Sequence, residues 1–178
     1  MTNDINLLVP EFREKVEQLL ANCKKLGYEM RPTETLRHPL IQAKYWRQSR
    51  TTQVINSKII ELQHAGAPFL ATCIENAGSQ SGPHVTNSIP GFSWHQWCEA
   101  IDCHWLLNGK AIWDTQLLIN GSNGYRVYAE EAAKLGLDAG MLWKKFPDAP
   151  HVQLRTIAAP YKLYSLKQID AEMSKRFK

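Results

Sequence analysis

The sequence has no long hydrophobic run. Within its 178 residues, no apolar segment approaches the ~18 residues that a membrane-spanning helix needs, so we expect no membrane anchor. Basic residues are also missing ahead of Arg13, where a secretory signal would carry them. We therefore expect a protein that is made in the cytoplasm without a signal peptide.

Cysteine and net charge are both low. Four cysteines in a chain with no expected signal favour free thiols over a disulfide framework. The 21 basic and 17 acidic side chains give a net charge of +4, and the basic residues are scattered. This charge suits a polyanionic partner such as nucleic acid or a cell wall, although a mildly basic surface is the simpler interpretation. We expect no nucleic-acid partner.

Length and pattern predict one α+β domain over residues 1–178. Helices are expected at residues 10–26, 39–48, 55–64, 125–135 and 166–176, with a short turn-helix at 137–146. Strands are expected at residues 28–36, 68–74 (strand or extended segment), 99–105, 111–113 and 152–157. Asn108-Gly109 predicts a type I′ hairpin between two of these strands. This order indicates a small, mostly antiparallel sheet flanked by helices.

The residues that can carry chemistry gather in the stretch GFSWHQWCEAIDCHW, residues 91–105. If residues 99–105 form a strand, Ala100, Asp102 and His104 share one face. A second segment, Asp-Ala-Pro-His at 148–151, places a carboxylate beside another histidine. His95, Asp102 and His151 would make the set of three His and carboxylate ligands that is typical of catalytic zinc sites.

Three ordered motifs resemble those of a known peptidase family. The pattern S-x-H-x-x-C-x-A-x-D, from Ser93 to Asp102, is similar to the S-x-H-x-x-G-x-A-x-D signature of the zinc D-Ala-D-Ala carboxypeptidase and L-alanyl-D-glutamate endopeptidase family, which includes phage endolysins. The segment D-A-P-H-V-Q at 148–153 resembles its D-x-P-H-x-Q block. Upstream, Arg37 and Gln42 resemble its R-S-x-x-x-Q block, with His38 in place of the serine.

The resemblance implies an activity and a role for each matching residue. It implies Zn²⁺ on His95, Asp102 and His151, with the zinc site on the face of the sheet. It also implies a catalytic carboxylate at Asp148 and a cation at Arg37 that stabilises the developing anion. Cys98 stands where the family has glycine, and we expect Cys98 to adopt a φ below zero.

Further residues are weaker candidates for substrate binding. They are Gln42, Arg50, His84 and Ser93. Arg50 is the second choice for the anion-stabilising role, and we expect Ser93 to orient the ligands. His84 lies in the 17-residue segment 75–91, which is long enough for a lid or a binding wall. Ser93 as a nucleophile would require an elbow such as G-x-S-x-G, which the sequence lacks. Cys98, Cys103 and His104 form a rival soft metal set, but Cys103 and His104 point to opposite faces of the expected strand.

We therefore expect a monomeric zinc metallopeptidase that acts on peptidoglycan in the bacterial cell wall after release, as an endolysin does. The bond expected is L-alanyl-D-glutamate, because a carboxypeptidase working outside the membrane usually carries an export signal or anchor. D-Ala-D-Ala carboxypeptidase activity is the first alternative. A noncatalytic wall-binding module with this fold is the second, and Cys98 is its only support.

Overall fold

The computed structural model describes residues 2–178, whose positions group into two compact units. Unit 1 consists of residues 37–97 and 157–178, and unit 2 consists of residues 2–36 and 98–156. Each unit is therefore built from two separate stretches of the chain. That residues 1–178 form one catalytic domain stays a prediction.

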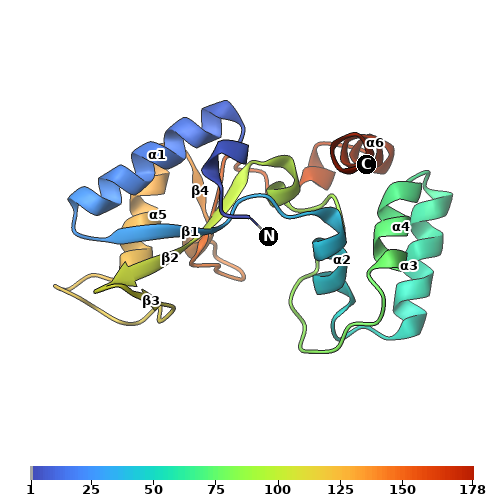
Figure 1. The fold of residues 1–178 in the computed structure, drawn as a ribbon, viewed down its shortest axis with the longest axis horizontal. Coiled ribbons are helices and arrows are strands. Elements are labelled where there is room, and N and C mark those ends of the chain that lie inside the picture. Colours follow the sequence, from blue (N-terminus) through green and yellow to red (C-terminus); the bar gives the residue numbers. More distant parts are fainter. Residues whose placement is uncertain (1) are drawn as a thin grey trace. The chain divides into compact units, whose positions relative to one another are not determined.

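The sheet of unit 2 is antiparallel and centres on strand β2, Ala100–Leu107 (Figure 1). On one side β2 pairs with β1 (Glu29–Glu34). On the other side β2 pairs with β5 (His151–Gln153) and with β3 (Lys110–Ile112). Strand β4 (Asp138–Ala139) pairs with β5. The expected α+β fold with a small antiparallel sheet is confirmed.

One face of this sheet is packed against helices α1 (Pro10–Lys25) and α5 (Gly124–Lys134), which also contact each other. The helices and β2 share one core of buried side chains, which includes Phe12, Val16, Leu19, Ile101, Cys103, Trp105, Tyr125 and Tyr128. Asp102 and His104 alternate with these β2 residues and are only partly buried. The predicted sharing of faces is therefore confirmed, and Asp102 points away from the core.

Local turn chemistry explains how several elements of unit 2 end. Helix α1 has Pro10 in its first turn and is followed by Gly27 at φ 88°. Between β2 and β3, Asn108 (φ 49°) and Gly109 (φ 76°) both lie in the left-handed region, as a type I′ turn requires. The hairpin prediction is confirmed.

Unit 1 is helical. It contains α2 (Pro39–Arg47), α3 (Thr52–His64), α4 (Pro68–Asn76) and α6 (Leu166–Phe177), with short 3₁₀ helices at Trp94–Trp97 and Pro160–Lys162. Helix α4 contacts α2, α3 and α6. The backbone N–H of Leu70 in its first turn donates to the buried carboxylate of Asp170 at 2.9 Å, which ties the start of α4 to α6.

Three sequence predictions of secondary structure differ from the fold. Residues 68–74 were expected to be a strand or extended, but they lie in α4, because a short apolar run has no period that separates a strand from a buried helix. Residues 137–146 contain β4 and a 3₁₀ helix at Gly140–Leu142 in place of a turn-helix. The strand expected at 152–157 is the shorter β5, with His151 as its first residue. No helix described within residues 2–178 is long and apolar enough to cross a membrane.

Candidate metal centre

Asp102 and His151 are direct partners across the β2–β5 strand pair. Their side chains meet, with Oδ1 of Asp102 lying 3.0 Å from Nδ1 of His151. The neighbouring partners Ile101 and Val152 are both fully buried in the core. A shift of the strand register by one residue would turn these apolar side chains to the opposite face of the sheet. Core packing therefore maintains the Asp102–His151 pair.

Gln153 determines which nitrogen of His151 faces Asp102. The amide nitrogen of Gln153 donates to Oδ2 of Asp138 at 3.2 Å and to the carbonyl of Arg155 at 2.6 Å. Its amide oxygen therefore faces Nε2 of His151, at 3.1 Å. A neutral His151 then carries its proton on Nε2 and presents the lone pair of Nδ1 on the side of Asp102, as a metal ligand requires.

The surroundings of His151 favour positive charge. Burial by itself lowers the pKa of His151, but the hydrogen bond and charge of Asp102, together with the Asp148 carboxylate, raise the pKa above its usual value. Trp143 contacts the imidazole, with ring centroids 5.3 Å apart, and donates its indole N–H to Oδ1 of Asp138 at 2.8 Å. The same negative potential that attracts a proton to this histidine also attracts a metal cation.

Asp148 and His151 are held in one turn that packs on Gly140. The N–H of Asp148 donates to the carbonyl of Gly140 at 3.0 Å, and the N–H of His151 donates to the carbonyl of Asp148 at 3.2 Å. A Cβ on Gly140 would overlap the Asp148 carbonyl and come within 3.1 Å of the His151 Cβ. The Asp148 residue is exposed and lines a hollow of about 440 Å³.

His95 lies in the 3₁₀ helix Trp94–Trp97, which is buried within unit 1. Ser93 supports this turn, because its hydroxyl accepts from the N–H of His95 at 3.4 Å. The indole N–H of Trp94 donates to the carbonyl of Ile157 at 2.7 Å, and that of Trp97 donates to the carbonyl of Gly91 at 3.0 Å. These hydrogen bonds fix the backbone on both sides of His95.

Arg37 and Gln42, predicted from the upstream motif, lie together beside the backbone of His95. The N–H of Arg37 donates to the carbonyl of His95 at 3.4 Å, and Nη1 of Arg37 donates to Oε1 of Gln42 at 3.1 Å. Gln42 is fully buried, accepts a second bond from Gln96 at 3.1 Å and donates to the carbonyl of Ser88 at 2.7 Å. This position suits Gln42 as a support for Arg37, and its role in substrate binding stays a prediction.

Arg50 and His84 lie elsewhere in unit 1. The guanidinium of Arg50 donates to the carbonyl of Trp46 and, at 2.9 Å, to that of Thr86, and it lies 4.4 Å from the centre of the Trp46 ring. Arg50 thus joins the end of α2 to the segment before Ser88. His84 is exposed in the irregular segment 77–93. The positions of Arg50 and His84 do not test whether either residue binds substrate.

The three predicted metal ligands form one group. Each of His95, Asp102 and His151 offers a ligand atom, and these atoms lie within 4.8 Å of one another. Two imidazoles and one carboxylate match the ligand sets of catalytic zinc sites, which reserve the fourth position for water or substrate. The donor set and the spacing therefore fit a single metal ion.

Residues 86–154 match a family model described as D-alanyl-D-alanine carboxypeptidase. This segment contains His95, Asp102, Asp148 and His151. The segment is therefore similar to the D-alanyl-D-alanine carboxypeptidase family. A search of curated proteins gives no match to the chain.

The match and the ligand group together suggest a metallopeptidase. Peptidases of the family depend on zinc, which His95, Asp102 and His151 would hold. The rival soft set is not favoured, because Cys103 is fully buried in the core and burial raises the pKa of its thiol to about 12. All four cysteines lie outside disulfides.

The expected backbone conformation of Cys98 is wrong. Cys98 has a φ of 60°, in the left-handed region where the family has glycine. Only Cys98 and Glu99 separate the 3₁₀ helix, which ends at Trp97, from β2, which begins at Ala100. The carbonyl of Cys98 accepts from the N–H of Val9 at 3.1 Å in this conformation.

Sequence reasoning missed four residues that support the peptidase site: Gln153, Asp138, Trp143 and Gly140. Gln153 was visible as the last residue of the D-x-P-H-x-Q block, although no role was assigned to it. Asp138, Trp143 and Gly140 lie outside the matching motifs. Their roles depend on contacts that only the folded chain shows.

Proposed function

We propose that this protein is an endolysin-like, zinc-dependent peptidoglycan peptidase that hydrolyses the L-alanyl-D-glutamate bond of the wall stem peptide. The observation that carries the proposal is the His95, Asp102 and His151 group, with Asp148 in the same turn as His151. All four residues fall in the segment that matches the carboxypeptidase family. The protein would act on the bacterial cell wall after release from the cytoplasm.

In the proposed reaction, one side chain transfers a proton and a second stabilises the negative charge that develops. When bound, zinc supplies Lewis-acid chemistry that activates water and polarises the scissile carbonyl. Asp148, an exposed carboxylate, accepts the proton of the attacking water and passes it to the leaving amine. The guanidinium of Arg37 stabilises the negative charge that develops on the carbonyl oxygen. Gln42 holds Arg37 through its 3.1 Å hydrogen bond.

The hollow beside Asp148 favours an endopeptidase. Because Asp148 delivers a proton to the leaving amine, the leaving part of the substrate must lie next to it. The hollow that Asp148 lines has a volume of about 440 Å³, which falls in the range of sites for whole small ligands. A single D-alanine would fill little of this space, whereas a D-glutamyl peptide would use it.

D-Ala-D-Ala carboxypeptidase activity is the second candidate, favoured by the description of the matching family. It differs from the first only in the bond that is cut. A noncatalytic wall-binding module is disfavoured, because such a module has no need for the intact ligand group with Asp148 beside it.

Digestion of purified cell wall tests the proposal. The zinc-loaded protein should produce new amino-terminal D-Glu without free D-Ala, as identified by mass spectrometry. Release of D-Ala alone would show the carboxypeptidase instead. Absence of any new ends, with zinc bound, would contradict both enzymatic proposals.

The role of Asp148 has its own test. Asp148→Asn should retain one zinc per chain but hydrolyse the wall ~10²–10⁴-fold more slowly, because a general base is lost. Asp4→Asn is a matched control, since asparagine also serves as the N-cap that Asp4 provides for residues 5–7. If Asp148→Asn loses its zinc, Asp148 is a ligand and the proposed role is wrong.

A further inference from the structure

The hollow beside Asp148 continues into a second one. The first is lined by Thr115, Gln116, Met141 and residues 147–150. The second, of about 380 Å³, shares Thr115, Gln116 and Met141 with the first and adds Leu118, Gly121, Ser122, Asn123 and Arg126. The two hollows adjoin at these three shared residues, and together, from Asp148 to the start of helix α5, they are here called the Arg126 groove.

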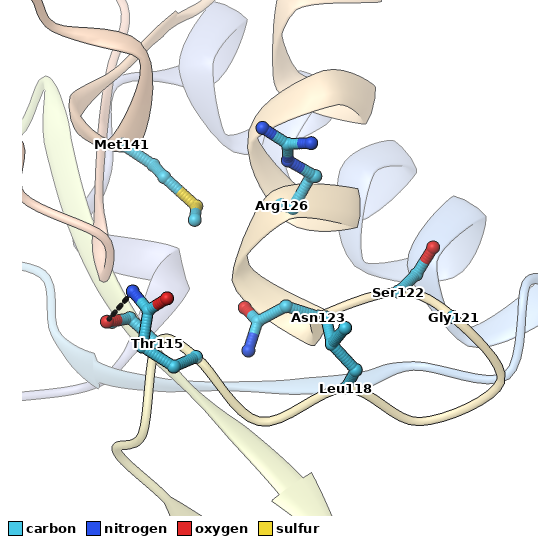
Figure 2. Close-up of a pocket in the computed structure, with 8 residues that line it drawn as sticks. Thr115, Leu118, Gly121, Ser122, Asn123, Arg126 and Met141 are labelled. Carbon is cyan, nitrogen blue, oxygen red and sulfur yellow. Dashed lines mark hydrogen bonds between the residues drawn. The ribbon is translucent and has the colours of Figure 1, made fainter.

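Figure 2 shows the part of the groove farther from Asp148. Met141 and Thr115 lie on one side, and Asn123 and Arg126, at the start of α5, lie on the other. Arg126 and Asp148 are the only charged residues among those that line the two hollows. A ligand that enters at Asp148 therefore meets a positive charge at the far end.

The wall of the groove is braced by Asn123. Its amide nitrogen donates to the carbonyls of Asp114 at 3.2 Å and Leu117 at 2.8 Å, and its oxygen accepts from the N–H of Tyr125 at 2.9 Å. Asn123 is 3% exposed. The segment between β3 and α5 is thus fastened to the helix, so the groove exists before a ligand binds.

The direction of the substrate follows from Asp148. The groove begins at the residue that protonates the leaving amine, so it receives the leaving part of the substrate. The leaving part of a wall stem peptide carries free carboxylates, that of D-Glu and that of the terminal D-Ala. A guanidinium binds a carboxylate through paired N–H donors, with geometry that an ammonium does not reproduce.

We propose that the Arg126 groove binds the leaving side of the stem peptide, and that Arg126 recognises a free carboxylate on it. This inference rests on the proposed peptidase function and adds the orientation of the substrate and a specificity residue. Arg126 is exposed and lies outside the group of metal ligands, so it acts on binding and not on the chemical step.

The test compares three soluble stem peptides on the zinc-loaded protein: one with all carboxylates free, one amidated at D-Glu and one amidated at the terminal D-Ala. Arg126→Gln should raise KM for the free peptide about tenfold, with kcat within about twofold. Amidation of the recognised carboxylate should raise the KM of the unaltered protein to the same extent and abolish the effect of Arg126→Gln. Arg126→Lys should recover only part of the loss.

Arg13→Gln is the matched control, because Arg13 is a partly exposed arginine of α1 that pairs with Glu17 outside the groove. It should leave KM for all three peptides unchanged. Equal KM values for Arg126→Gln and the unaltered protein on every peptide would overturn the groove assignment while the peptidase function stands. If the unaltered protein holds zinc but cleaves none of the peptides or the wall, the proposed function fails and this inference fails with it.

Discussion

At Cys98 the chain holds a cysteine in a conformation that favours glycine. A left-handed φ of 60° costs a residue with a Cβ roughly 1–2 kcal/mol, a cost that glycine avoids. The carbonyl of Cys98 also accepts a hydrogen bond from the N–H of Val9, which helps to hold the backbone in this conformation.

Cys98→Gly should therefore raise the free energy of unfolding by about 1 kcal/mol and retain zinc. Chemical denaturation and elemental analysis check both parts. Cys103→Gly, in the fully buried core, should instead lower stability because it leaves a cavity. Loss of zinc in Cys98→Gly would mean that the thiol supports the metal site and would revive the soft-ligand alternative.

Gln153 orients His151, the proposed metal ligand, through its amide oxygen. Gln153→Met keeps a similar size but removes the acceptor for Nε2–H, so zinc affinity should fall about 10–100-fold. Competition with a chelating dye measures this affinity, and the Tm of the metal-free protein separates it from a loss of folding. Trp143→Phe, which removes the donor to Asp138 but keeps an aromatic ring beside His151, should weaken zinc binding less. An unchanged affinity in Gln153→Met would contradict this role.

At the scale of elements, the site depends on how closely the turn at 148–151 approaches the 3₁₀ helix Gly140–Leu142. Gly140 is required for space and not for backbone freedom, because its φ is not positive and a Cβ there would strike Asp148. The turn positions both the proposed proton carrier and a proposed metal ligand, so a small displacement affects both.

Gly140→Ala should lower activity per bound zinc by at least tenfold, because misplacement of a catalytic group by about 1 Å is costly. Gly136→Ala is the control: Gly136 has a φ of 72° and nothing within 4 Å of an added Cβ. That control should lose stability but keep activity per bound zinc. Assays with matched zinc content distinguish the two, and full activity in Gly140→Ala would contradict the tight packing inferred here.

The sequence predicted the elements whose signals are local and the site residues that lie in motifs. The Asn108-Gly109 turn and the alternation along β2 require only neighbouring residues. The order of the motifs led to the prediction of His95, Asp102 and His151, whose ligand atoms lie within 4.8 Å of one another. The helix at Pro68–Asn76 was missed because its apolar run is short, although the buried Leu70, Ala71 and Ile74 follow helical spacing where the helix contacts three others. The spatial role of Gly140 was invisible for a similar reason, since its neighbours arrive from residues 148–151.

At the scale of the molecule, the segment that matches the family is smaller than the unit that folds around it. Residues 86–154 include β2 and β5 but lack β1 and α1. Helix α1 supplies Phe12, Val16 and Leu19, all fully buried, to the core that backs the sheet. Without them the apolar face of the sheet would be open to water.

A protein cut to residues 86–154 should therefore fail to fold, with no cooperative thermal transition by circular dichroism and no stoichiometric zinc binding. The full chain under the same conditions is the control. A cooperative transition in the excised segment would show that the sheet does not require α1 and β1.

The pairing of Asp102 with His151 across β2 and β5 means that the proposed metal would also link these two strands. An ion held by both residues joins positions 49 apart in the chain, and it binds only when the two strands are in register. Stability then depends on metal supply: above the dissociation constant, each tenfold rise in free zinc adds about 1.4 kcal/mol to the free energy of unfolding. A chelator should consequently lower the Tm and speed proteolysis of β5. The lifetime of the protein among proteases would then be set by the zinc content of its surroundings.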